Sequence, residues 1–239
     1  MNSLPRLSQT SQLKFGCTPH VPCFNLCCRD LNLALSPYDV LRLRTALKID
    51  SKTFIQNYGA LTQLPGNQFP ALMLKMSKAA DAPCPFVGPS GCGVYPHRPG
   101  ACRTYPLGRG ASINDNGDIQ EVYVLVREDH CLGFESSATQ TVAEYLQTQG
   151  MVRYIWFDNL YLKLMHHVSR QGGPLSKSNF SKVFIGVYRP DILESVLEGT
   201  CLPPLDGLVD TPLDMTAEEI ILVQAMTWLQ KPLKVSPDK

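Results

Sequence analysis

Residues 84–106 read Cys-Pro-Phe-Val-Gly-Pro-Ser-Gly-Cys-Gly-Val-Tyr-Pro-His-Arg-Pro-Gly-Ala-Cys-Arg-Thr-Tyr-Pro, which places Cys84, Cys92 and Cys102 among repeated prolines and glycines. Proline and glycine interrupt helices and strands, so this stretch predicts loops with little regular structure of their own. A loop-rich segment of this kind needs covalent or metal cross-links to stay ordered. We therefore expect the cysteines to hold this part of the fold together.

Eight of the nine cysteines precede residue 135, and they are Cys17, Cys23, Cys27, Cys28, Cys84, Cys92, Cys102 and Cys131. Thiolates bind soft and borderline metals strongly, so we predict that these eight are metal ligands. Cys23 and Cys27 have the spacing of a chelating knuckle. The adjacent Cys27 and Cys28 point in different directions: both could bind one polynuclear cluster, or one could serve a neighbouring site. Cys201 is expected to be a lone, inert thiol.

The bulk properties argue against a disulfide framework as the role of so many cysteines. Residues 1–15 contain no apolar run that could form a signal-peptide core, and no stretch approaches the roughly 18 apolar residues of a membrane span. We therefore expect the protein in the cytoplasm, where thiols stay reduced and disulfides are rare. The 22 basic and 21 acidic residues nearly balance, which offers no argument for binding nucleic acid or an acidic membrane surface.

Short regular elements are predicted between the cysteine groups. Ser36-Pro37-Tyr38-Asp39 begins a helix, because serine caps a helix and proline suits its first turn. A second short helix is predicted over Ser51–Tyr58, ended by Gly59. The Asn116-Gly117 dipeptide favours a tight turn, and the β-branched run 119–126 completes a hairpin.

After about residue 138 the sequence is typical of helices. One or two long helices are predicted over Thr139–Val168, and a shorter one from near Pro190 to Gly199. The last helix is predicted from Thr216, where Thr-Ala-Glu-Glu fits a capping box, to Trp228 or Leu229.

These elements predict an α+β fold, in which a small loop-rich, metal-stapled domain with short helices and a β-hairpin precedes a mainly helical region. The expected divisions are a flexible N-terminal segment over residues 1–15, a cysteine-cluster metal-binding domain over 16–135 and a helical C-terminal region over 136–239.

The residues around the cysteines resemble a known family. Phe15 to Gly133 is similar to the YkgJ-type cysteine-cluster proteins, which are described as zinc- or iron-chelating. The elements that carry the resemblance are the phenylalanine-led run ending in Cys27-Cys28, the Ser36-Pro37-Tyr38-Asp39 helix start, Cys84-Pro85-Phe86, Gly91-Cys92, Tyr95-Pro-His-Arg98-Pro99, Cys102-Arg103-Thr-Tyr105-Pro106 and His130-Cys131-Leu-Gly133. The resemblance implies metal chelation and no settled reaction. Many members open with a compact Cys-x-x-Cys-Gly-x-Cys-Cys run, whereas five residues separate Cys17 from Cys23 here, so the roles of Cys17 and His20 stay open.

Spacing favours an iron–sulfur cluster over Zn²⁺. Structural zinc sites usually have two knuckles of two to four residues, but one cysteine pair fits here and the intervals from Cys84 to Cys92 and Cys102 are wider. Iron–sulfur sites tolerate irregular spacing because the cluster is larger. Eight ligands allow two four-cysteine sites or one site with spare thiols, and the sequence does not choose between them.

Other polar residues near the cysteines have simpler interpretations. His20, His97 and His130 could substitute as metal ligands, but loop hydrogen bonding is the expected role of each. Arg98 and Arg103 could offset the negative charge of a thiolate cluster or bind an anion. Alternatively, they hold the loop by stacking on tyrosine and pairing with carboxylates, and this is the role that we favour.

Three functions follow from these interpretations. The favoured one is an iron–sulfur protein with a redox or accessory role. The second is a structural zinc module whose helical C-terminal region binds a protein partner. The third, by analogy with the cysteine clusters of flagellin lysine methylases, is a cluster-dependent protein-modifying enzyme. The chain has no phosphate-binding loop, dinucleotide fingerprint or nucleophile elbow, so no catalytic residue is predicted and the question of enzyme activity stays open.

Overall fold

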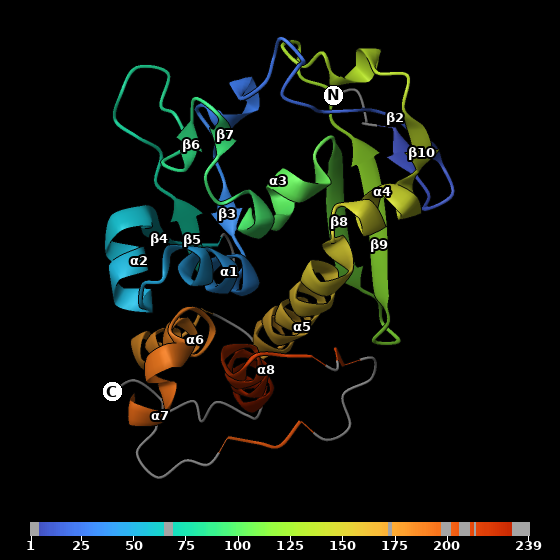
Figure 1. Cartoon of the computed structure of the whole chain (residues 1–239). Helices are drawn as coiled ribbons and strands as arrows, with labels where there is room; N and C mark the ends of the chain where they lie inside the picture. Colours follow the sequence, from blue (N-terminus) through green and yellow to red (C-terminus); the bar gives the residue numbers. More distant parts are fainter. Residues whose placement is uncertain are drawn as a thin grey trace.

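The computed structural model describes residues 5–64, 69–171, 174–196, 202–205, 211–212 and 214–230. Helices and small antiparallel sheets are combined along the chain, so the predicted α+β class is confirmed. Two strand-bearing arms stand on either side of a short central helix, α3 (Gly100–Thr104), and the later helices lie beneath them (Figure 1). Among the described helices, none combines the length and the apolar content needed to cross a membrane.

The first arm combines two helices with a three-stranded sheet. Helices α1 (Pro37–Leu47) and α2 (Ser51–Tyr58) are confirmed at their predicted positions, and Ser36 forms a capping box with Asp39 at the start of α1. The sheet has the order β3-β5-β4 and consists of β3 (Ala34–Leu35), β4 (Gly59–Gln63) and β5 (Pro70–Leu74). The sequence does not predict this sheet, because β3 has two residues and β5 is apolar throughout, without the alternation of a half-exposed strand.

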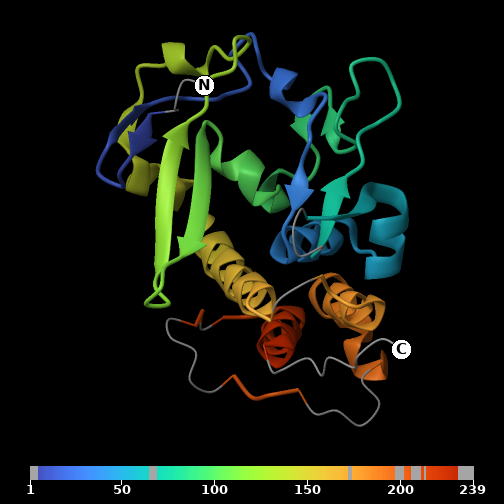
Figure 2. The ribbon, with the colours of Figure 1, turned by 180° about the vertical axis from the view of Figure 1, so that it is seen from behind.

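The second arm contains the predicted hairpin, extended by one strand from the N-terminus, and a separate two-stranded sheet. The hairpin consists of β8 (Leu107–Ile113) and β9 (Ile119–Leu125), and Gly117 takes a positive φ of 88° in the connecting turn. Strand β1 (Arg6–Leu7) pairs with β9, and β2 (Gln12–Lys14) pairs with β10 (Thr139–Thr141). Figure 2 shows this arm from behind, with the N-terminal chain running beside the hairpin.

The part of residues 1–15 that the structure describes is paired and packed, whereas the division of the chain at residue 15 stays a prediction. Besides the strand pairing, the side chains of Leu13 and Phe15 are buried in the core, with 2% and 4% of their surfaces exposed. Strands of two and three residues are too short to show a period of two in the sequence, and their partners lie more than a hundred residues away.

The C-terminal region is helical, as predicted, with one helix added. The long predicted stretch becomes α4 (Val142–Thr148) and α5 (Met151–Ser169), and α8 (Ala217–Leu229) begins at the predicted capping box of Thr216 and Glu219. The segment near Pro190 forms a 3-10 turn, η4 (Pro190–Ile192), followed by α7 (Leu193–Val196). Its predicted end at Gly199 lies outside the described residues. Helix α6 (Lys177–Tyr188), capped by Ser176, is not among the predictions.

Short elements order the cysteine-bearing loops. They are the 3-10 turns η1 (Leu26–Cys28), η2 (Tyr95–His97) and η3 (Gly133–Glu135), and the paired strands β6 (Val87–Gly88) and β7 (Gly91–Cys92). The prediction that this part of the chain makes little regular structure of its own agrees with the brevity of these elements.

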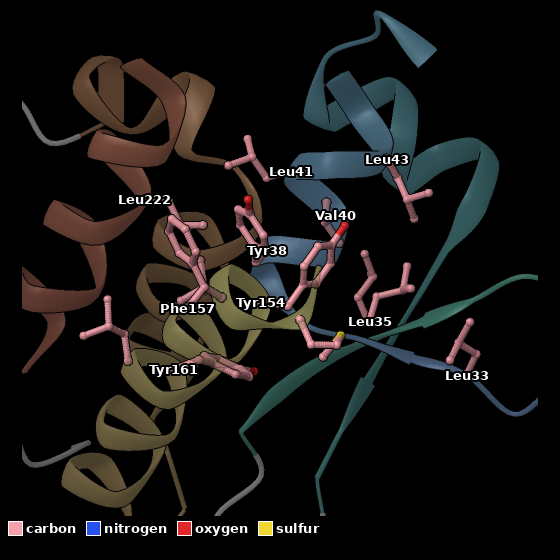
Figure 3. Close-up of a cluster of buried hydrophobic side chains, with 14 of the residues drawn as sticks. Leu33, Leu35, Tyr38, Val40, Leu41, Leu43, Tyr154, Phe157, Tyr161 and Leu222 are labelled. Carbon is pink, nitrogen blue, oxygen red and sulfur yellow. The ribbon is translucent and has the colours of Figure 1, made fainter. Parts of the chain in front are cut away.

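The core joins the two predicted domains. Tyr38 of α1 stacks on Phe157 of α5, with ring centroids 4.0 Å apart and an angle of 4° between the rings (Figure 3). The Tyr188 hydroxyl of α6 donates a hydrogen bond of 3.2 Å to the carbonyl of Leu35 in β3. The division at residue 135 stays a prediction, but hydrophobic packing continues across it.

Candidate metal centre

The segments that carry the eight predicted ligands lie on the same side of the molecule. In Figure 1 they gather around β6, β7 and α3 and along the chain above them, on the opposite side of α1 and α5 from α8. All eight are free thiols. Cys23 is buried, Cys28, Cys84, Cys92 and Cys131 are partly buried, and Cys17, Cys27 and Cys102 reach solvent. Cys201 lies outside the described residues.

One group of backbone contacts brings the first cysteines to Cys131. The Gly16 amide donates a hydrogen bond of 2.9 Å to the carbonyl of Gly133, which lies two residues after Cys131. The amide of Leu132 donates to Sγ of Cys23 across 3.3 Å. Phe15 packs edge-on against Phe134, with ring centroids 5.3 Å apart, and covers this junction on the core side. Cys17, Cys23 and Cys131 are therefore held around one junction.

A second group of contacts joins Cys28 to the loop of residues 84–92. The Cys84 amide donates a hydrogen bond of 2.8 Å to the carbonyl of Cys28, and the Val87 amide donates one of 3.1 Å to the carbonyl of Cys84. Val87 is the strand partner of Cys92 in the β6–β7 pair. Gly91, with φ at 114°, lies under the Phe24 ring, where a Cβ would come within 3.0 Å of the ring. Glycine suits this approach, because residues with a side chain rarely adopt the positive φ and a Cβ would crowd the ring.

Helix α3 carries Cys102 into the second group. Asp39 Oδ1 accepts a hydrogen bond of 2.7 Å from the amide of Gly100, the first residue of α3. Asp39 also accepts from the Ser36 amide through its other oxygen, so one buried carboxylate caps α1 and holds α3. The position of Cys102 thus depends on the N-terminus of α1.

The thiols of Cys27 and Cys28 interact directly, with 4.0 Å between their sulfur atoms. The hydrogen bond from Cys28 stabilises the Cys27 thiolate and lowers its pKa to about 7, while giving that bond raises the pKa of Cys28. Near neutral pH, Cys27 therefore becomes a thiolate more readily than an ordinary cysteine, and the thiolate is the form that attacks electrophiles and binds metals.

Burial and neighbouring thiols raise the pKa of three other cysteines, Cys17, Cys84 and Cys102. Burial, followed by the negative charges of Cys27, Cys23 and Cys131, raises the pKa of Cys17, and Arg98 opposes this rise. Burial and Cys92 raise the pKa of Cys84. The pKa of Cys102 rises to about 12, because surrounding protein atoms, Asp39 and the thiols of Cys84, Cys92 and Cys27 all disfavour its thiolate. A set of thiols that oppose one another's ionisation in this way favours a bound cation that neutralises them.

Tyr105 adds a proton donor beside Cys131. Its hydroxyl is buried and makes no well-formed hydrogen bond with any described residue. Burial and the neighbouring Cys131 thiol raise the pKa of Tyr105, so its hydroxyl keeps its proton throughout the neutral range. A buried donor without an acceptor is costly, and a thiolate at Cys131 would satisfy it.

The donor chemistry fits a thiolate-bound metal, but the side chains do not yet converge. Among the described residues, no three cysteine, histidine, aspartate or glutamate side chains stand close enough to hold a metal ion as they are. Thiolates about 2.3 Å from a tetrahedral metal lie about 3.8 Å from one another, so a metal bound by four of these cysteines would require their side chains to move closer together. The amide bonded to Cys23 and the hydroxyl of Tyr105 are the outer partners that such thiolates use.

Loop hydrogen bonding is predicted for three histidines, and His97 and His130 have side-chain partners. His97 Nδ1 lies 3.0 Å from a guanidinium nitrogen of Arg42, and burial together with Arg42 and Arg103 lowers the pKa of His97, which favours the neutral, accepting ring. His130 Nε2 lies 3.4 Å from a carboxylate oxygen of Glu128. His20 is exposed in a turn.

The two arginines hold the loop, as favoured from the sequence, through a different set of acceptors. Arg98 stacks on Tyr95, with 3.9 Å from the guanidinium carbon to the ring centroid, and donates to the side chain of Gln149. Arg103 donates to the backbone carbonyls of Arg98, Gln149 and Pro96 and stacks on Tyr154. Backbone and amide oxygens thus replace the expected carboxylates. Both arginines tie the cysteine-bearing loop to the junction of α4 and α5.

Three contributors to the site are absent from the sequence-based prediction. They are the Leu132 amide, the Tyr105 hydroxyl and the bond from Asp39 to α3. Asp39 and Tyr105 both lie in stretches that carry the family resemblance, and this resemblance is the sequence signal that points to them. A backbone amide leaves no residue-specific signal at all.

Comparison with known proteins agrees with the chemistry of the donors. Residues 16–132, close to half of the chain, match the family model CxxCxxCC, whose description is "Putative zinc- or iron-chelating domain". Neither the curated proteins nor the solved structures compared with the chain include a match. The match confirms the resemblance seen around the cysteines, and the stretch of residues 16–132 belongs to the CxxCxxCC family of zinc- or iron-chelating domains.

Proposed function

We propose that the protein binds an iron–sulfur centre through Cys17, Cys23, Cys27, Cys28, Cys84, Cys92, Cys102 and Cys131, and serves a redox or accessory role in the cytoplasm. The observation that carries the proposal is the delivery of eight free thiols to one side of the molecule by three separate stretches of the chain. Cysteine thiolates are the ligands of iron–sulfur clusters, which accept and release single electrons.

The residues around the thiols have roles that suit such a centre. The Leu132 amide and the Tyr105 hydroxyl are placed to donate hydrogen bonds to the sulfurs of Cys23 and Cys131, and such bonds set reduction potentials. Phe15 and the apolar residues behind it exclude water from the core side. Arg98 places a positive charge near Cys17, which favours a thiolate there.

Structural zinc is the competing function, because four thiolates also make a complete zinc site. The two are distinguished by purifying the protein without air and measuring iron, zinc, acid-labile sulfide and the visible spectrum. The proposal expects a coloured protein with iron and sulfide in equal amounts. A colourless protein with stoichiometric zinc would establish the structural module instead. The Cys201→Ala variant is the matched control, since it removes the one cysteine outside the predicted ligand set and should keep the wild-type metal content.

A further inference from the structure

We propose that the eight thiols form two separate four-cysteine metal sites that meet at the peptide joining Cys27 to Cys28. The first site takes Cys17, Cys23, Cys27 and Cys131, and the second takes Cys28, Cys84, Cys92 and Cys102. This inference rests on the proposed function and specifies how its ligands are divided, a choice that the sequence leaves open.

Backbone geometry assigns three cysteines to the first site. The hydrogen bonds from Gly16 to Gly133, 2.9 Å long, and from Leu132 to the Cys23 sulfur, 3.3 Å long, hold Cys17, Cys23 and Cys131 at one junction. Tyr105 and Phe134 lie against the same junction, where each ring packs edge-on against Phe15. These contacts all involve the chain around residue 132 and none of them reaches the loop of residues 84–92.

A different set of backbone contacts assigns three cysteines to the second site. The 2.8 Å bond from the Cys84 amide to the Cys28 carbonyl and the pairing of Val87 with Cys92 fix Cys28, Cys84 and Cys92 relative to one another. The bond of 3.4 Å from Asn25 to the carbonyl of Gly88 closes the same loop onto the turn before η1. Cys102 reaches this site from α3, which Asp39 holds at its first residue.

The neighbours of each thiol assign Cys27 to the first site and Cys28 to the second. Cys27 interacts with Glu128 and Cys17, which both lie at the first junction, whereas Cys28 interacts with Cys84 and Cys102. Cys102 in turn interacts with Cys84 and Cys92, and more weakly with Cys27 across the boundary between the two sets. Although their sulfur atoms are 4.0 Å apart, the two thiols lie on either side of a single peptide bond, so each can complete the set to which its other neighbours belong. The count of four thiolates per site then matches the requirement of either a cubane iron–sulfur cluster or a tetrahedral zinc ion.

The division has a consequence for function. Cys27 and Cys28 have sulfur atoms 4.0 Å apart, so two centres bound through them are close neighbours. If both hold iron–sulfur clusters, the unpaired electrons of the reduced clusters interact, and an electron can pass from one centre to the other through a single peptide unit.

Paired double variants test the division. Cys17→Ala with Cys131→Ala removes two ligands of the first site, and Cys84→Ala with Cys92→Ala removes two of the second. With the metal content of anaerobically purified protein as readout, each double variant should keep about half of the wild-type metal, a twofold loss, and the combination of all four should keep none. If both double variants lose all metal, or if one loses all and the other none, a single centre is present and the division is wrong.

Measurements on the unaltered protein cover the case in which a variant fails to fold. Two sites predict about eight iron atoms per chain, or about two zinc ions, against about four or one for a single site. If iron is present, electron paramagnetic resonance of the reduced protein should show a spectrum broadened by spin coupling between two clusters. An uncoupled signal with metal for one site overturns the division and leaves the proposed function standing, whereas protein without any bound metal overturns the proposed function itself.

Discussion

The carboxylate of Asp39 accepts a hydrogen bond of 2.7 Å from the amide of Gly100, a residue 61 positions further along the chain. The same side chain accepts from the Ser36 amide across 3.0 Å and thereby completes the capping box of α1. A single buried carboxylate therefore fixes two helix N-termini, where backbone amides lack partners and negative charge is favoured. Through α3 it also fixes the backbone of Cys102, so the local start of one helix sets the position of a distant thiol.

Replacing Asp39 should weaken both helices at once. We expect Asp39→Ala to lower the free energy of unfolding by about 2–4 kcal/mol, because a helix cap and a buried hydrogen bond are lost together. Urea unfolding monitored by circular dichroism measures the change. Asp50→Ala, which removes the exposed cap of α2, is the matched control and should cost less. Equal losses in the two variants would contradict a double role for Asp39.

Asp158 should make stability depend on pH. Burial and the nearby Asp39 raise the pKa of Asp158 to about 7, and its Oδ1 is buried without a hydrogen-bond partner among the described residues. The folded protein therefore binds a proton that the unfolded chain, with a carboxyl pKa of about 3.9, has already released. This contribution to stability is complete below about pH 4 and is lost as the pH rises through about 7, by on the order of 1.4 kcal/mol per pH unit at most.

Unfolding by urea at several pH values checks the role of Asp158. The Asp158→Asn variant should show a flatter dependence between about pH 4 and pH 7 than the unaltered protein. Asp118→Asn, in the exposed turn of the β8–β9 hairpin, should leave the dependence as it was. A slope that is the same in all three proteins would show that Asp158 carries no shifted proton.

Tyr105→Phe should change the electronic properties of the metal centre without emptying it. The hydroxyl is placed to donate to Cys131, and a hydrogen bond to a sulfur ligand stabilises the reduced cluster. Loss of about 1 kcal/mol of hydrogen bonding should lower the one-electron reduction potential by on the order of 40 mV. Redox titration of the purified protein measures the potential. Tyr95→Phe is the control, because Tyr95 is 56% exposed and its ring stacks on Arg98. A shift of the same size in both variants would argue against a specific bond to Cys131.

Glu219 should couple the cysteine-bearing part of the chain to the C-terminal helices. It is 1% exposed, accepts a hydrogen bond of 2.8 Å from Tyr38 of α1 and pairs with Arg153 of α5 across 2.7 Å. We expect Glu219→Gln to lower the stability of the whole chain by about 1–3 kcal/mol, because the partly exposed Arg153, which also pairs with Asp214, loses the buried one of its two carboxylate partners. In denaturant unfolding, fluorescence of the tryptophans and absorbance of the metal centre should shift together. Separate transitions would indicate that the two parts unfold independently.

Local signals account for what the sequence predicts of the fold. Ser36 and Thr216 lie at helix starts with an acidic residue three positions later, and both capping boxes form. Asn116-Gly117 marks a hairpin because glycine takes the positive φ that the turn requires. These features involve residues close in sequence, so one chain is enough to recognise them.

Long-range pairing explains what the sequence does not predict. Leu13 is buried because Gln12–Lys14 pairs with Thr139–Thr141. This partner lies far along the chain, and no sequence pattern predicts the pairing. The grouping of the cysteines also depends on contacts between residues that are distant in sequence. Their spacing predicts that they bind metal, but the bonds from Leu132 to Cys23 and from Cys84 to Cys28 decide which of them lie together. Those contacts are made largely by backbone atoms, which every residue carries.

Iron, zinc and acid-labile sulfide per chain, measured together with the visible spectrum on protein purified without air, test the central claim most directly. The proposed function and the division of its ligands predict a coloured protein with about eight iron atoms and as many sulfides, in two clusters bound by four cysteines each. A colourless protein without iron, or one that holds no metal while its fold is intact, would contradict the account.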